Sequence, residues 1–253
     1  MIPLFKSQYS LGRSILTLDA HGTGVQNGPD SIVDIAVENK FNEVFLVDDS
    51  MTGFLQAYKN LKDHNIKLIF GLRLSVCSDM HNKSEEELGK TSKSIIFAKN
   101  KSGYERLIKI STDAARNGFY YQPRIDYKTL ASYWSEDDLT LCIPFYDSFL
   151  YYNTLTSAVC LPDFSFTTPT MFVEDNDLPF DDIIRQKVES YAASNDLRVE
   201  KAKSIYYINN KDFKAYLTFR CVNNRSTLNK PNLEHMCSDK FSFESWSVNN
   251  ESI

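Results

Sequence analysis

The feature that most constrains the fold of this chain is a regular alternation of amphipathic and apolar segments between residues 30 and 76. Segment 30–40 (DSIVDIAVENK) starts with polar residues and then spaces apolar ones as a helix does, and segment 42–49 (NEVFLVDD) is a short apolar strand. A second helical segment, 52–65, and a second apolar segment, 66–76, follow after short connections. This alternation predicts βα units around a parallel sheet.

The remainder of the chain continues the pattern with weaker signals. Strands are predicted at 94–100, 138–145, 157–166 and 203–208, and helices at 102–118, 179–196 and 211–224. Residues 82–93 are polar and charged, which is typical of a solvated excursion, and the Ser- and Asn-rich end of the chain predicts an extended tail. Several βα units in one undivided chain indicate a barrel or a doubly wound sheet.

Composition narrows the class of protein. A chain of 253 residues fits one large domain. Its net charge of −5 argues against a surface that binds nucleic acid over its whole extent, but it does not exclude a local basic groove. The sequence has neither a signal-peptide core nor a run of ~20 apolar residues, so we expect no membrane segment. Its five cysteines form no C-x-x-C pair, and we expect reduced thiols in a cytoplasm.

Several segments, read in order, resemble one family. They are QYSL, DSIVDIAVENKFNEVFLVDDSMTGFLQAYKNLKDHNIKLIFGLRL, SIIFAKNKSGYERLIKIS, GFYYQPRIDYKTL and KSIYYINNKDFKAYLTFRCV. The set is similar to the polymerase-and-histidinol-phosphatase (PHP) domain, in particular to the copy at the N-terminus of bacterial DNA polymerase III alpha subunits. The resemblance implies an α/β fold, a distorted TIM-like (β/α)7 barrel, which we place at residues 1–235 with a C-terminal tail at 236–253.

The resemblance also implies where a metal centre would lie. Active PHP domains hold up to three zinc or manganese ions at the C-terminal ends of the barrel strands and hydrolyse phosphoesters. Seven family ligand positions can be traced, and they fall on Leu4, Lys6, Val47, Asp48, Arg73, Ser204 and Tyr206. None keeps its family residue type, so the resemblance implies that the metal centre is lost and that no cofactor is bound. We expect Asp48 to form a salt bridge with Lys6 or Arg73 in place of the ions, and Asp49 or Ser50 to cap the following helix.

Three functions are compatible with these residues. The first is a non-catalytic PHP-domain protein of DNA replication that docks to a polymerase catalytic subunit or another replisome protein, with weaker evidence for contact with DNA. We expect docking through aromatic faces near 119–123 and 146–152 and through the tail. Because the chain ends about where a polymerase palm would begin, we expect a stand-alone protein or one piece of a split polymerase, in a bacterial cell or encoded by a phage.

The second function is a zinc- or manganese-dependent phosphoesterase, of the 3′–5′ exonuclease or pyrophosphatase type, with a rearranged site. Its ligands would come from Asp48, Asp49, His21 or Asp147. The third is a decoy or inhibitor that captures host replisome partners. The sequence does not separate the third function from the first.

Other polar groups have a metal-like or phosphate-binding appearance. They are Asp19 with His21, Cys77 with Asp79 and His81, His235 with Cys237, and the basic residues Arg13, Arg124 and Lys128. Plain loops and ordinary surface charges are the favoured interpretations for all of them. The acidic run 173–182 (VEDNDLPFDD) is interpreted as a solvated loop and a helix start.

Overall fold

The computed structural model describes residues 1–25, 28–229 and 236–250, and within these the chain forms two compact units. The first unit comprises residues 1–70, 174–181 and those from 202 onward, and therefore includes residues on both sides of the predicted boundary at 235. The second comprises residues 71–173 and 182–201. Each unit is described by itself below.

The strands are connected as a ring. They are β1 (Ile2–Phe5), β2 (Glu43–Asp48), β3 (Lys67–Cys77), β4 (Ser92–Ala98), β5 (Arg124–Asp126), β6 (Leu139–Ile143), β7 (Thr170–Val173) and β8 (Val199–Ile205). Their hydrogen-bonded order is β2-β1-β8-β7-β6-β4-β3-β5, and β2 also pairs with β3. This extra pairing closes seven strands into a ring, with β5 as an additional strand beside β3, so the predicted seven-stranded barrel is confirmed.

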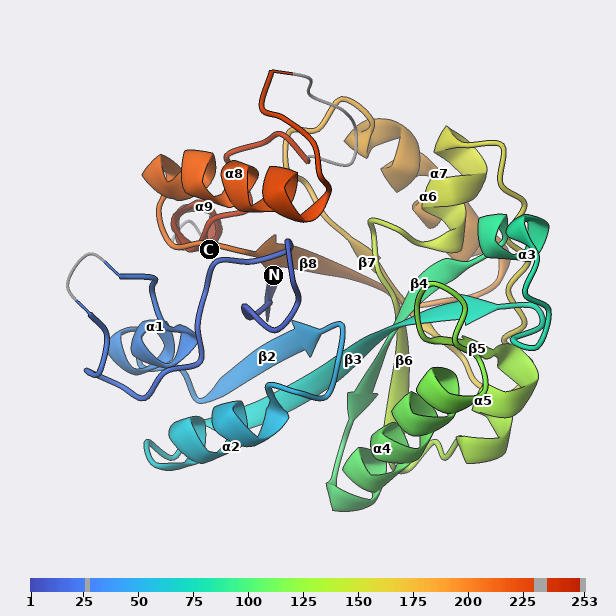
Figure 1. Ribbon diagram of the computed structural model, residues 1–253, viewed down its shortest axis with the longest axis horizontal. Coiled ribbons are helices and arrows are strands. Elements are labelled where there is room, and N and C mark those ends of the chain that lie inside the picture. The colour runs from blue at the N-terminus through green and yellow to red at the C-terminus, as the bar shows by residue number, and fades with distance from the viewer. Residues whose placement is uncertain (26–27, 230–235, 251–253) are drawn as a thin grey trace. The chain divides into compact units, whose positions relative to one another are not determined.

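The first unit is built on parallel pairing at β1. This strand pairs with β2 on one side and with β8 on the other. The helices of this unit are α1 (Ile32–Glu38), α2 (Phe54–Lys62), the 3-10 helix η1 (Asn210–Asp212), α8 (Phe213–Asn223) and α9 (Phe243–Asn250). Figure 1 shows α1 and α2 next to β2, and the predicted helix–strand alternation of residues 30–76 is confirmed.

The second unit differs from the prediction of a parallel sheet. Its helices are α3 (Glu85–Gly89), α4 (Lys101–Arg116), α5 (Tyr127–Tyr133), α6 (Phe149–Leu155) and α7 (Asp181–Ser194), the last beginning at the boundary residue of the first unit. Strand β4 runs antiparallel to both β3 and β6. The connection from β3 to β4 contains the short helix α3, but it does not cross to the other end of the strands, so β3 and β4 are antiparallel neighbours.

One local prediction in the second unit is wrong. Residues 157–166 form no strand, and the strand of this region is β7, a few residues later. Residues 82–93 are mostly exposed or half-buried, as predicted, and they contain α3 and the first residues of β4. Glu87 of α3 is buried and accepts hydrogen bonds from the backbone N–H groups of Ser78 and Asp79 at 2.9 and 3.0 Å.

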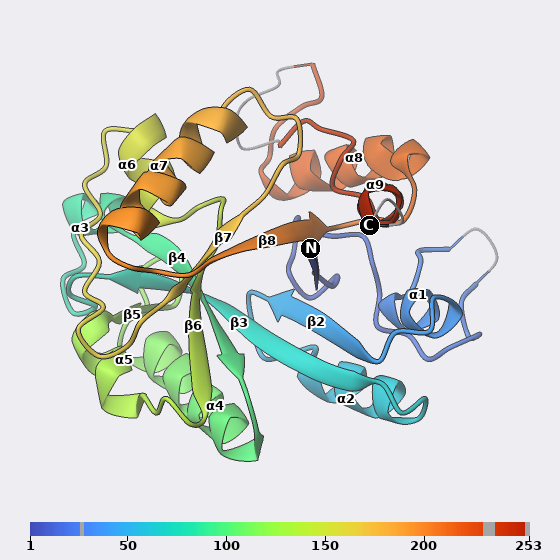
Figure 2. The same cartoon turned by 180° about the vertical axis from the view of Figure 1, so that it is seen from behind.

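The C-terminal segment is also not an extended tail. It forms α9, which lies beside the N-terminal strand in Figure 2. The ring of Phe243 stacks on Phe5 with centroids 6.2 Å apart, and the indole N–H of Trp246 donates to the carbonyl of Met1 at 3.1 Å. The Ser- and Asn-rich segment thus contains two aromatic residues, Phe243 and Trp246, and their contacts attach α9 to the N-terminal strand and to Met1. Across the described residues, every helix is too short or too polar to span a bilayer.

Candidate functional site

Strand register brings six of the seven predicted ligand positions into the first unit. The backbone of Leu4 in β1 lies opposite Phe45 in β2 and opposite Ser204 in β8. Because these strands are parallel, their C-terminal ends meet, and Lys6 and Tyr206 follow directly after β1 and β8. Six positions traced from three separate motifs therefore occupy one edge of one unit, at the ends of β1, β2 and β8.

Asp48, the only acidic residue among these positions, is fully buried and is bound by serines. Its Oδ1 accepts the backbone N–H of Ser7 at 2.9 Å and the hydroxyl of Ser10 at 2.8 Å, and its Oδ2 accepts the hydroxyl of Ser7 at 2.6 Å. Burial raises the pKa of Asp48, while the positive charge of Lys6 and these hydrogen bonds lower it. Both carboxylate oxygens are thus engaged by donors from the loop after β1.

Lys6 forms its ion pair with the neighbouring carboxylate. Its Nζ lies 3.2 Å from Oδ1 of Asp49, and the Lys6 side chain is buried. The expected salt bridge at Asp48 therefore takes a different form, in which Lys6 acts on Asp48 through its charge and contacts Asp49. The predicted helix cap at Asp49 or Ser50 is wrong, because α2 starts after Gly53, which offers no side chain for capping.

Arg73 lies in β3 within the second unit and forms an ion pair with Asp147. Asp147 has a left-handed backbone conformation, with φ at 61°, which is uncommon for a residue other than glycine. Its carbonyl accepts the backbone N–H of Lys93 at 2.8 Å. The cation at this predicted ligand position is therefore tied to a carboxylate from the segment after β6.

Comparison with known proteins identifies the family of the chain. The family model for the PHP domain matches residues 23–152, about half of the chain. The chain belongs to the PHP domain family. Its PHP domain resembles DNA polymerase III alpha subunits. That of Aquifex aeolicus is 26% identical over 79% of this chain and 18% of its own length. Those of Borreliella burgdorferi and Helicobacter pylori are 33% and 38% identical over 40% and 32% of this chain.

This PHP chain spans less than a fifth of the length of these relatives. A solved structure described as a metal-dependent phosphoesterase from Bifidobacterium adolescentis aligns with a TM-score of 0.43 at 11% identity, over 80% of this chain and 87% of that one.

Sequence reasoning missed one member of the site, Glu174, which follows β7. The acidic run 173–182 was expected to be solvated, but Glu174 is buried. Its two carboxylate oxygens accept the backbone N–H and the hydroxyl of Ser204, both at 2.8 Å, and one of them also accepts the side-chain amide of Asn176 at 3.0 Å. Burial raises the pKa of Glu174. The signal was the apolar strand TMFV directly before the acid.

The residues of this PHP domain do not suit the metal ions that the family implies. A divalent ion needs several oxygen or nitrogen ligands with free lone pairs. The carboxylates of Asp48 and Glu174 are instead surrounded by N–H and O–H donors, and cations stand at two ligand positions. Among the described residues, no three His, Cys, Asp or Glu side chains are grouped so that they could hold a metal ion.

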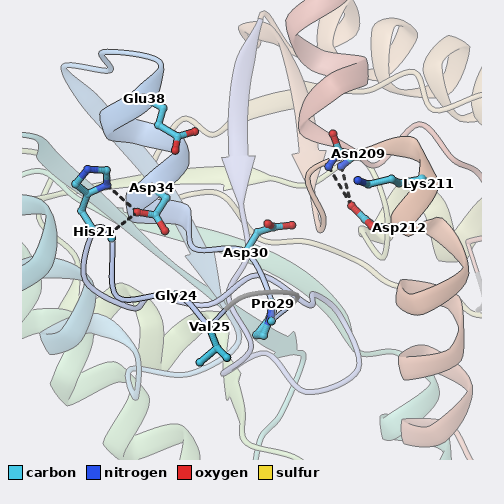
Figure 3. A pocket seen from close by; sticks show the side chains of 12 residues that line it. His21, Gly24, Val25, Pro29, Asp30, Asp34, Glu38, Asn209, Lys211 and Asp212 are labelled. Carbon is cyan, nitrogen blue, oxygen red and sulfur yellow. Dashed lines mark hydrogen bonds and ion pairs between the residues drawn. The ribbon is translucent and has the colours of Figure 1, made fainter.

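Asp19 and His21, which have a metal-like spacing in the sequence, each contact a different residue. His21 Nδ1 lies 2.7 Å from Oδ1 of Asp34, whereas Asp19 accepts the side-chain amide of Gln56 at 3.4 Å. His21 and Asp34 line a cavity of about 570 Å³, drawn in Figure 3, together with Asp30, Glu38, Lys211 and Asp212 among others. Burial and the charge of Asp212 raise the pKa of Asp30.

In the remaining clusters, several described groups are engaged by contacts within the protein or are buried. The Cys77 thiol is buried and donates to the carbonyl of Ile125 at 3.6 Å, while Asp79 accepts the backbone N–H of His81 at 2.8 Å. His235 lies outside the described residues. Arg124, expected at the surface, is instead completely buried.

The buried carboxylate of Asp48 gives a pH-dependent prediction for an Asp48→Asn variant. The pKa of Asp48 is raised above its ordinary value of 3.8, so the folded protein holds this proton more tightly than the unfolded chain. The stability that this carboxyl contributes is therefore present below pH 3.8 and is lost as the pH rises through the folded pKa. The free energy of unfolding of the natural protein, relative to Asp48→Asn, should decrease as the pH rises above 3.8.

Urea unfolding of both proteins at a series of pH values measures this difference. A difference that stays constant, or that grows with pH, would contradict the buried, desolvated environment of Asp48. A Glu189→Gln variant on an exposed position of α7 is the control, and it should not reproduce the pH trend.

Proposed function

We propose that this chain is a PHP-domain protein of DNA replication that has no hydrolytic activity of its own and docks to a polymerase of the DNA polymerase III alpha type. The observation that carries the proposal is that Lys6 and Arg73, which the family resemblance places at two ligand positions, each form an ion pair with a carboxylate. The similarity to the alpha subunit of Aquifex aeolicus over 79% of the chain supports the replication context.

Electrostatics oppose metal chemistry at these positions. Two unit charges ~4 Å apart interact by roughly 4 kcal/mol at an effective dielectric constant of 20, and a divalent ion would roughly double the repulsion. Lys6 and Arg73 would each repel such an ion, while their ion pairs need no metal. The side chains thus hold the strand ends together with ion pairs and hydrogen bonds.

One of the three docking elements expected from the sequence remains as an exposed surface. Phe119 and Tyr121 are 52% and 76% exposed. Tyr121 adopts a left-handed conformation, with φ at 59°, and its ring meets that of Tyr120 edge-to-face, while the buried guanidinium of Arg124 lies over the Tyr120 ring. Strain of this kind in a bulky residue often accompanies a functional role. We call residues 119–121 the aromatic tip.

In the other two expected docking elements, the described aromatic residues are buried or half-buried. In segment 146–152, Tyr146, Phe149 and Tyr151 are buried and serve the packing of the second unit. In the C-terminal segment, Phe243 stacks on Phe5 of β1 and Trp246 donates to the carbonyl of Met1.

Co-purification with a polymerase catalytic subunit tests the proposal. The full chain should retain such a subunit, and Phe119→Ser with Tyr121→Ser should weaken retention by roughly tenfold or more, as is common when exposed aromatic anchors are removed. Leu161→Ser is a matched control, because Leu161 is also exposed in the same unit but lies outside the aromatic tip.

Two results would overturn the proposed function. One is a chain that retains no polymerase subunit. The other is manganese- or zinc-dependent hydrolysis of bis(p-nitrophenyl) phosphate that disappears in Asp48→Ala.

A further inference from the structure

The outer face of α2 carries an unusual combination of side chains. Leu55, Tyr58, Lys59 and Lys62 follow one another at helical spacing i, i+3, i+4 and i+7, which places them on one stripe. Leu55 is 57% exposed and Tyr58 is 44% exposed, and both lysines are exposed. The opposite face of the helix is buried through residues such as Leu61. We call these four exposed residues the α2 stripe.

The aromatic ring of the stripe is held in place by its neighbours. Phe54, one turn earlier, stacks on Tyr58 with an interplanar angle of 11° and a centroid distance of 5.8 Å. Lys62, one turn later, places its Nζ 5.6 Å from the centre of the same ring. Tyr58 is therefore held by a neighbour on each side along the helix, and the residue is still 44% exposed.

The helix itself is also fixed. The side-chain amide of Asn60 donates to the carbonyl of Leu18 at 2.7 Å, and the hydroxyl of Tyr9 donates to Gln56 at 2.8 Å. A partner that binds a surface already in its bound conformation loses less side-chain entropy on binding. The α2 stripe is therefore a preorganised surface.

The charge of the stripe indicates what would bind there. The chain carries a net charge of −5, yet α2 contains two lysines and no acidic residue. Lysines near a helix C-terminus interact favourably with the helix dipole, which accounts for Lys59 and Lys62. It does not account for the exposed apolar pair beside them. On α4 the exposed Ile108 is flanked instead by charges of both signs, Glu105 and Lys109.

We propose that the α2 stripe docks an acidic segment of a partner protein, with a large apolar side chain against Leu55 and the edge of Tyr58, and carboxylates against Lys59 and Lys62. The proposal specifies the chemistry of a partner for the docking role proposed above, on which it rests. A single-stranded nucleic acid fits less well, because bases stack on free aromatic rings, and Tyr58, the one aromatic residue of the stripe, already stacks with Phe54 and has the Lys62 ammonium 5.6 Å from its centre.

Fluorescence anisotropy with a labelled synthetic peptide tests this proposal. The peptide carries Glu and Asp around Leu and Phe at helical spacing, and it is titrated with the full chain at low and at moderate salt. The peptide should bind, and Leu55→Ser with Lys59→Glu should weaken binding by roughly tenfold or more, because an apolar anchor and a charge contact are both lost. Higher salt should also weaken binding.

The matched control is Ile108→Ser with Lys109→Glu, which makes the same chemical changes on the exposed face of α4 and should leave the affinity unchanged. Far-UV circular dichroism and thermal unfolding verify that both double variants stay folded. Absence of peptide binding, equal weakening by both variants, or equal binding of a peptide with Lys in place of the acids would each overturn the proposal. Tighter binding of an oligo-dT strand than of the peptide would overturn it as well.

The outcome is separable from that of the proposed function. Peptide binding at the stripe by a chain that retains no polymerase subunit would support the acidic-segment surface and overturn the polymerase as its partner. Retention of the subunit that Leu55→Ser with Lys59→Glu leaves unchanged, together with no peptide binding, would overturn the stripe alone.

Discussion

Replacing Arg124 with alanine should lower the free energy of unfolding by about 3 to 5 kcal/mol. The guanidinium is completely buried and donates to the backbone carbonyls of Gly118, Met80 and Asn82 at 3.3, 3.2 and 3.0 Å. It also lies 5.4 Å from the centre of the Tyr120 ring. Alanine would leave these carbonyls without their donor and would open a cavity beneath the aromatic tip.

Urea unfolding measures the loss, and Arg116→Ala is the matched control. Arg116 is an exposed arginine in the last turn of α4, so its removal should change stability by no more than about 0.5 kcal/mol. Equal effects of the two substitutions would contradict the structural role of Arg124. Because Arg124 supports Tyr120, the variant should also weaken retention of a polymerase subunit.

Gly103→Ala should destabilise the protein by about 2 to 3 kcal/mol, as overpacking against backbone does. A Cβ at Gly103 would lie 2.2 Å from the carbonyl oxygen of Asp138 and 3.3 Å from the Cα of Ala98, so the backbone would have to move. The N–H of Gly103 also donates to the capping side chain of Asn100 at 2.9 Å. The glycine in segment 100–104 (NKSGY) is therefore required by packing, since the start of α4 lies directly against the connection before β6.

Gly89→Ala is the control for this substitution. Gly89 also belongs to a helix, but nothing lies within 4 Å of the position that its Cβ would take. Thermal unfolding should show a clear decrease for Gly103→Ala and little change for Gly89→Ala. A neutral result at Gly103 would mean that α4 and the segment at Asp138 can separate without cost.

The fold could be predicted where the local pattern decides the structure. The helices and strands between residues 30 and 76 follow their apolar spacing, and the family resemblance supplied the closed barrel. The strand predicted at 157–166 was wrong, because the apolar residues of this segment belong to irregular backbone. Cys160 is buried there, and the ring of Phe164 packs against Tyr127 and Phe149.

The site was predictable only in part. Alignment to the family motifs placed Leu4, Asp48 and Ser204 at meeting strand ends. The hydrogen bonds at these positions join residues that are far apart in the sequence, such as Ser7 with Asp48 and Glu174 with Ser204. No local pattern encodes such pairs, and the solvated appearance of the acidic run hid Glu174.

We propose that the metal centre of the family is lost in this chain, and the metal stoichiometry of the purified protein is the direct test. The full chain, purified without chelator and dialysed against zinc or manganese, should contain only substoichiometric metal by plasma mass spectrometry. Asp48→Ala should leave that content unchanged. Stoichiometric zinc or manganese that is lost in Asp48→Ala would contradict the claim and restore this chain to the metal-dependent phosphoesterases.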